Sequence, residues 1–128
     1  FGVRANGQRY GWNADTNEAR DRNAASSADQ RYDTLNHMQK SSNPSARWEI
    51  ALPNGAYDVR VVMGDPNHFD SIFRLNAEAT AILRATPTTG SRWKEASALI
   101  NVTDGRLTLS NGSGASNNKL CFVDITAR

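Results

Sequence analysis

The sequence has one cysteine, two histidines and no long hydrophobic run among its 128 residues. A single cysteine cannot form an intramolecular disulfide. Cys121 lies in the apolar run Leu120-Cys121-Phe122-Val123, which predicts a buried structural thiol rather than a nucleophile. No apolar run approaches the roughly 18 residues of a membrane helix, so membrane insertion is not expected.

The chain also lacks the motifs of several function classes. The net charge is +2 with scattered Lys and Arg, and no basic run would follow phosphates, so no nucleic-acid binding is expected. There is no G-x-S-x-G, no P-loop and no His or Cys spacing typical of a metal site. Asp65 and Asp70 flank one loop like a glycosidase pair, but only their closeness in sequence supports catalysis. We therefore predict a protein that is not an enzyme.

The clearest pattern runs from Trp48 to Asp65, W-E-I-A-L-P-N-G-A-Y-D-V-R-V-V-M-G-D. Apolar residues alternate with polar or small ones on both sides of Pro53-Asn54-Gly55, which predicts a β-hairpin with one buried face. The segment that follows Met63 is polar and rich in turn residues, so we expect a functional loop there.

Further short strands are predicted, with turn signals between them and no convincing helix. They cover residues 32–39, 71–75, 80–83, 93–102, 107–109 and 120–125, and Asp104-Gly105 is interpreted as a hairpin turn. This pattern predicts a single domain over residues 1–128, an all-β antiparallel β-sandwich.

The segment from Asn13 to Gln30 is polar and predicts a long irregular loop. Its oxygen-bearing side chains leave two interpretations open. They could hold a structural calcium ion, with Asp15 and Asp21 as the candidate ligands, or Arg20 and Arg22 could pair with the carboxylates. No other cofactor is expected.

Several segments resemble, in order, the malectin and malectin-like domains, which are carbohydrate-binding β-sandwiches of the galactose-binding (jelly-roll) type. Residues 29–39 resemble the strand D-x-x-L-Y-Q-T-E, and the Trp48–Asp65 segment resembles Y-x-I-P…G-x-Y-x-V-x-L-x-F-A-E. Residues 71–77 fall where that family has F-D-V-x-V-N-G, and Lys119-Leu120-Cys121 where it has K-V-C. The resemblance implies a module of the kind appended to secreted bacterial polysaccharide-degrading enzymes, with a further strand before Phe1.

In malectin, loop aromatics and an acidic residue before the last strand hold the sugar. By position, the resemblance implies that the equivalent sites fall at Asn36 or His37, at His68 and Phe69, and at Asn117 or Asn118. The chain departs from the family at two of them, because Asn36 replaces a tyrosine and an asparagine replaces the late aspartate.

The residues themselves add further candidates. Sugar rings stack on aromatic faces, and their hydroxyls bond amides and carboxylates. Trp12, Tyr32 and Phe69 are aromatics outside the buried alternation, and Asp65 is either a hydroxyl acceptor or a cap for its own loop. We therefore expect a secreted, non-catalytic carbohydrate-binding module that targets an attached catalytic domain to a polysaccharide. The sugar could be neutral or uronic-acid-containing, with Arg31 or Arg92 pairing the acid. A protein-interaction or structural sandwich, or a small lyase or hydrolase, stays open as an alternative.

Overall fold

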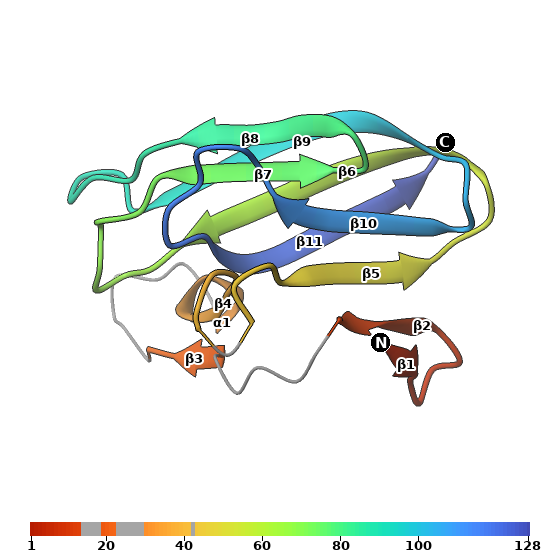
Figure 1. The fold of residues 1–128 in the computed structure, drawn as a ribbon, viewed down its shortest axis with the longest axis horizontal. Coiled ribbons are helices and arrows are strands. Elements are labelled where there is room, and N and C mark those ends of the chain that lie inside the picture. The colour runs from red at the N-terminus through yellow and green to blue at the C-terminus, as the bar shows by residue number, and fades with distance from the viewer. Residues whose placement is uncertain (14–18, 23–29, 42) are drawn as a thin grey trace.

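The computed structural model describes residues 1–13, 19–22, 30–41 and 43–128, and it consists of two antiparallel sheets packed as a β-sandwich. One sheet has the strand order β1 (Gly2–Val3), β2 (Arg9–Trp12), β5 (Arg47–Ala51), β10 (Arg106–Asn111), β7 (Phe73–Ala77) and β8 (Thr80–Ala85). The other has the order β3 (Ala19–Asp21), β4 (Thr34–His37), β11 (Lys119–Ala127), β6 (Gly55–Gly64) and β9 (Trp93–Val102). The predicted fold class is confirmed (Figure 1).

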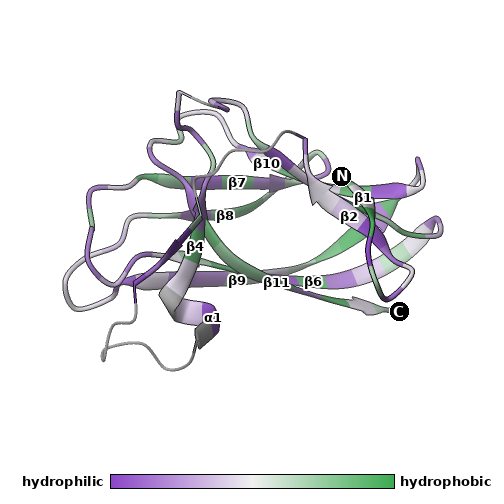
Figure 2. Cartoon of the chain, turned by 90° about the horizontal axis from the view of Figure 1, so that it is seen from below, coloured by the Kyte–Doolittle hydropathy of each residue, from purple (hydrophilic) through white to green (hydrophobic). Residues whose placement is uncertain are grey.

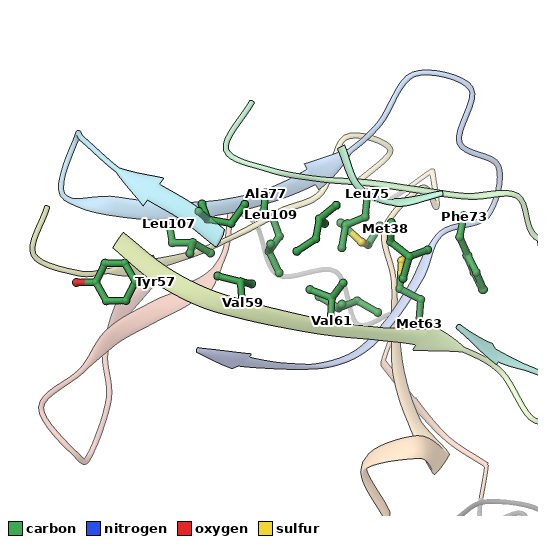
Figure 3. Close-up of a cluster of buried hydrophobic side chains, with 14 of the residues drawn as sticks. Met38, Tyr57, Val59, Val61, Met63, Phe73, Leu75, Ala77, Leu107 and Leu109 are labelled. Atoms are coloured by element: carbon green, nitrogen blue, oxygen red, sulfur yellow. The ribbon is translucent and has the colours of Figure 1, made fainter. Parts of the chain in front are cut away.

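The core lies between the two sheets, and strand β6 supplies one side of it. Tyr57, Val59, Val61 and Met63 alternate along β6 and are buried, as their spacing predicts. They face buried side chains of the opposite sheet, among them Leu75, Ala77, Leu107 and Leu109 (Figure 3). Burying each Val or Leu contributes roughly 1.5–3 kcal/mol, so this interface is the main source of stability.

The predicted hairpin between Trp48 and Asp65 is wrong. β5 pairs with β2 and β10, whereas β6 pairs with β9 and β11, so the two strands belong to different sheets. Figure 2 shows the two layers, with β7, β8 and β10 in one and β6, β9 and β11 in the other. Strands that face each other across a core have the same alternation as hairpin partners, and for this reason the sequence pattern could not separate the two arrangements.

The predicted hairpin turn at Asp104-Gly105 is wrong for the same reason, since it joins β9 of one sheet to β10 of the other. The two inter-sheet connections bond to each other. Leu52 N donates to the Gly105 carbonyl at 3.0 Å, and Gly105 N donates to Asn54 Oδ1 at 2.8 Å. These bonds close one end of the sandwich.

A one-turn helix, α1 (Gln30–Asp33), occupies the start of the strand predicted over residues 32–39. The Tyr32 ring packs edge-on against Trp93 and Phe122, with centroids 5.7 and 5.3 Å away. Trp93 Nε1 donates to the Tyr32 carbonyl at 2.9 Å. In Figure 2, α1 lies outside the layer that contains β6, β9 and β11, so these aromatics fasten the helix to the outer face of that sheet. No helix in the described part of the chain is long and apolar enough to cross a membrane.

Candidate functional site

In Figure 1, β6 ends and β11 begins at the same end of the sandwich, on the side of β3 and β4. Side chains from these segments line a cleft. It has a volume of about 280 Å³. Polar and charged side chains line it, and basic residues predominate, so it is called the basic cleft below. The lining residues are Arg20, Arg22, His37, Lys40, His68, Asp70, Asn117 and Lys119.

The carboxylate of Asp65 lies buried beside the cleft and organises it. Arg22 donates to both oxygens, at 3.2 and 2.9 Å, and Lys119 Nζ donates to Oδ2 at 3.1 Å. The backbone N–H of Asn67 donates to Oδ1 at 2.9 Å. The predicted loop-capping role of Asp65 is therefore confirmed, and its oxygens already accept four hydrogen bonds from three residues.

Burial by itself would raise the pKa of Asp65, but the hydrogen bonds from Asn67, Arg22 and Lys119 outweigh it and hold the pKa below its ordinary value. Asp65 is therefore ionised at neutral pH. A fixed anion at this position explains how the chain keeps Lys119 in a nearly solvent-free setting.

His37 is the other buried polar group of the cleft, with 5% of its surface exposed. Its Nδ1 atom has no hydrogen-bond partner within the described residues. Burial, followed by the charges of Lys40, Lys119, Arg20 and Arg22, lowers the pKa of His37 to about 4. The imidazole is therefore neutral at pH 7.

The opposite wall joins two loops. The segments that precede β7 and β11 meet at the Ile72–Ser116 bridge, and Ser71 Oγ donates to the Asn117 carbonyl at 2.8 Å. Asn117 Nδ2 lies 3.4 Å from Asp70 Oδ1. Asn117 has φ +55°, a left-handed conformation that asparagine tolerates better than most residues. This wall presents an amide and a carboxylate to the cleft.

The structure brings together three of the predicted ligand-binding residues, because His37, His68 and Asn117 all line the basic cleft. Phe69 follows His68 in the same loop and is half-buried under the Arg92 guanidinium, which lies 5.2 Å from the ring centroid. The loops after β6 and before β11 therefore meet at one site, as the sequence interpretation expected.

Asn118 is not a ligand contact, and that prediction is corrected. The residue is fully buried. Its Nδ2 donates to the Arg74 carbonyl at 2.7 Å and to Asn111 Oδ1 at 2.8 Å, and its Oδ1 accepts from Arg74 N at 3.1 Å. Asn118 instead joins the two sheets behind the cleft.

The remaining predicted residues lie elsewhere. Trp12 and Asn36 line a separate cavity of about 290 Å³ between the sheets, together with Trp48. Tyr32 packs on the outer face of the β6–β9–β11 sheet, as described above, so its ring is committed to holding α1. The predicted site residues are therefore divided among three places.

The sequence interpretation missed most of the basic residues of the cleft. Arg31 and Arg92 had been expected to pair with an acidic sugar, but neither lines the cleft, and Arg31 lies over the Phe122 ring at 4.4 Å. Of the cations that do line it, Arg20 lies in β3 and Arg22 directly after it, Lys40 follows the end of β4, and Lys119 begins β11. No local pattern in the sequence marked these cations as residues of one site.

The calcium prediction remains a prediction. Asp15 lies outside the described residues, and Asp21 is exposed at the end of β3. Within residues 1–13, 19–22, 30–41 and 43–128, no group of three His, Cys, Asp or Glu side chains could hold a metal ion.

No protein-family model matches the chain, and no curated protein matches its sequence. Among solved structures, protein YxiM of Bacillus subtilis matches 93% of the chain with a TM-score of 0.60 and 25% sequence identity. A calcium-binding mutant of β-glucuronidase 2 from Bacteroides uniformis matches 98% of the chain with a TM-score of 0.63 and 13% identity. The chain spans 32% and 15% of the lengths of those two chains. It is therefore similar in fold to a smaller part of each of two larger bacterial proteins, one of them a glycosidase.

Proposed function

We propose that the chain is a non-catalytic carbohydrate-binding module, and that the basic cleft is its saccharide-binding site. The observation that carries the proposal is the meeting of His37, His68 and Asn117 with Asp70 in one open, polar cleft at the loop end of a β-sandwich. Amide, carboxylate and imidazole groups are the donors and acceptors that sugar hydroxyls need.

A non-catalytic role is supported by the ionisation and the contacts of the Asp65 and Asp70 carboxylates. A glycosidase needs one carboxylic acid of raised pKa opposite a free carboxylate. Asp65 has a lowered pKa, and Arg22 and Lys119 occupy its oxygens. Asp70 is exposed and is the acidic residue that lines the cleft.

The similarity in fold to a part of a β-glucuronidase supports a module that is attached to a carbohydrate-active enzyme. In this interpretation the module belongs to a secreted enzyme and keeps its catalytic domain near a polysaccharide. Such tethering raises the effective concentration of the enzyme at its substrate and requires no new chemistry in the module.

The first test is affinity electrophoresis of the domain in gels that contain neutral and acidic plant and algal polysaccharides. We expect one class to retard the protein, and His68→Ala or Asn117→Gly to abolish the retardation. Glycine is chosen at position 117 because it adopts the left-handed backbone without strain. Asn101→Ala, at an exposed position on β9, is the matched control.

Two outcomes would contradict the proposal. If Asn36→Ala abolishes retardation while the two cleft variants do not, the sugar occupies the cavity between the sheets instead. If no polysaccharide retards a folded protein, the domain serves as an interaction or structural module.

A further inference from the structure

The basic cleft carries an excess of positive charge that neutral sugars would not use. Among the residues that the structure describes, four cationic side chains line it, from Arg20, Arg22, Lys40 and Lys119, against one carboxylate, that of Asp70. Even with the buried carboxylate of Asp65, the cations outnumber the anions.

Among the described residues, the carboxylates of Asp65 and Asp70 do not engage every donor of Lys119 and Lys40. Asp65 binds Arg22 in a bidentate pair and gives Oδ2 to Lys119 as well, so one anion serves two buried cations. Lys119 Nζ lies 3.9 Å from Asp70, beyond hydrogen-bond distance. An ammonium has three N–H donors, and the side chain of Lys119 is 98% withdrawn from solvent, which makes an additional acceptor valuable.

Two further observations point to an acceptor supplied from outside. Lys40 lies at the cleft with no hydrogen-bond partner for its ammonium among the described residues. His37 lines the same cleft, nine-tenths buried, with Nδ1 unpartnered. Burial is the main cause of the lowered pKa of this imidazole, and the neighbouring positive charges that add to it also favour a bound anion.

The cleft also contains groups that a simple anion would not need. The Asn117 amide and the Asp70 carboxylate lie side by side on one wall and are suited to ring hydroxyls, which a simple anion lacks. The volume of about 280 Å³ lies at the lower end of small-molecule pockets, which fits one sugar unit rather than a long chain segment.

We infer that the basic cleft binds an acidic sugar unit, with the sugar carboxylate beside Lys119 and Lys40 and the ring hydroxyls against Asn117 and Asp70. This inference rests on the proposed carbohydrate-binding function and specifies its ligand class. Charge-assisted bonds to a carboxylate are roughly twice as strong as neutral ones, so the acid group would dominate selectivity.

The test is an NMR titration of the protein with matched pairs of methyl glycosides, galactoside against galacturonoside and glucoside against glucuronoside. The members of a pair differ only in the oxidation state of C6. We expect one uronoside to bind at least about tenfold more tightly than its neutral partner, the gain that one charge-assisted bond provides. Raising NaCl from about 50 to 500 mM should shrink the difference, because salt screens exposed charges.

Two variants test whether the preference for the uronoside arises in the basic cleft. Lys40→Gln should weaken uronoside binding severalfold more than it weakens binding of the neutral glycoside. Arg84→Gln removes the same charge from an exposed position on β8 of the opposite sheet and should change neither. Lys119 is unsuitable for this purpose, because it also stabilises Asp65.

The outcomes separate this inference from the function on which it rests. Equal affinity for acidic and neutral glycosides would overturn the acidic-sugar inference and leave a carbohydrate-binding module. Preference for a sulfated galactoside over both uronosides would show that the cleft recognises a sulfate, and it would overturn the inference that the recognised acid group is a carboxylate. Absence of binding to every glycoside and polysaccharide would overturn the proposed function itself.

Discussion

Asp65 and Lys119 form an ion pair of 3.1 Å in which the two side chains are 0% and 2% exposed. The pair joins the end of β6 to the start of β11, and Arg22 adds the end of β3 through its own bonds to Asp65. One buried carboxylate thus holds three segments around the basic cleft. The cleft is consequently a rigid part of the fold rather than a feature of a free loop.

Removing this carboxylate should be costly. Asp65→Ala leaves Lys119 buried without its partner, and breaking such a pair lowers the free energy of unfolding by about 3–5 kcal/mol. Urea unfolding measures the change. The control is Asp58→Ala, which removes an exposed partner of Arg128 and should cost less than about 1 kcal/mol. Similar costs for the two variants would contradict the central role of Asp65.

The protonation of His37 should appear as a pH dependence of stability. The folded pKa is about 4 and the unfolded value is about 6.5, so between these values the unfolded chain binds more protons. The free energy of unfolding should therefore rise with pH across that window, by about 3 kcal/mol at most. The groups responsible, besides burial, are Lys40, Lys119, Arg20 and Arg22, which all oppose a charge on the imidazole.

The measurement is a series of urea unfolding curves from pH 4 to 7, an interval that follows from the two pKa values of His37. His37→Gln should flatten the rise, whereas His68→Gln, at an exposed position, should retain it. The ionisation of Asp65 affects the free energy of unfolding at a lower pH than that of His37. Its lowered pKa contributes stability that is lost only as the pH falls below the ordinary range of a carboxyl group. An unchanged slope in His37→Gln would refute the assignment.

A methyl group should not fit at Gly64, where β6 passes into the cleft loop. Gly64 has φ +157°, and a Cβ atom there would lie 2.6 Å from the Arg92 carbonyl oxygen and 2.6 Å from Trp93 Cδ1. A backbone oxygen cannot move aside cheaply, so Gly64→Ala should destabilise the fold by at least about 2 kcal/mol. Gly90→Ala, in open space, should stay within about 0.5 kcal/mol of the parent in thermal unfolding.

Asn118 should behave as a structural residue. Asn118→Ala removes three side-chain hydrogen bonds and leaves the backbone of Arg74 and the side chain of Asn111 without these partners. Each buried group left unsatisfied costs about 1–3 kcal/mol, so a total loss of about 3 kcal/mol or more is expected. Chemical denaturation measures the change. Asn101→Ala, at an exposed position on β9, should leave the free energy of unfolding almost unchanged. A stable Asn118→Ala that had lost only sugar binding would restore the residue to the binding site.

The strands could be predicted where one face is buried. The strand predicted over residues 93–102 begins and ends at the same residues as β9. The alternation along β6 identifies the side chains that β6 contributes to the core. The sheet to which each strand belongs could not be predicted, because Trp48 and Ile50 alternate in the same way whether their partner lies beside them or across the core.

The cleft was harder to predict for a different reason. His68 and Asn117 stand in turn-rich loops and could be selected from the sequence, whereas Arg22, Lys40 and Lys119 have no local signal that sets them apart. They meet only because β4 pairs with both β3 and β11, which brings together residues about a hundred positions apart. Long-range pairing of this kind leaves no periodic trace in the sequence.

The thiol of Cys121 reports on the same region. Burial, and to a lesser extent the charge of Asp65, raises the pKa of Cys121 to about 12. Because the thiolate is the reactive form, a disulfide reagent at pH 8 should label the folded protein very slowly and the urea-unfolded protein at once. Asp65→Ala should speed the labelling of the folded state, since it removes a nearby negative charge and loosens the segment that covers the thiol. Rapid labelling of the folded parent protein would show instead that the paired strands β6 and β11 separate near Cys121 and admit solvent, and the basic cleft beside them would then not be rigid.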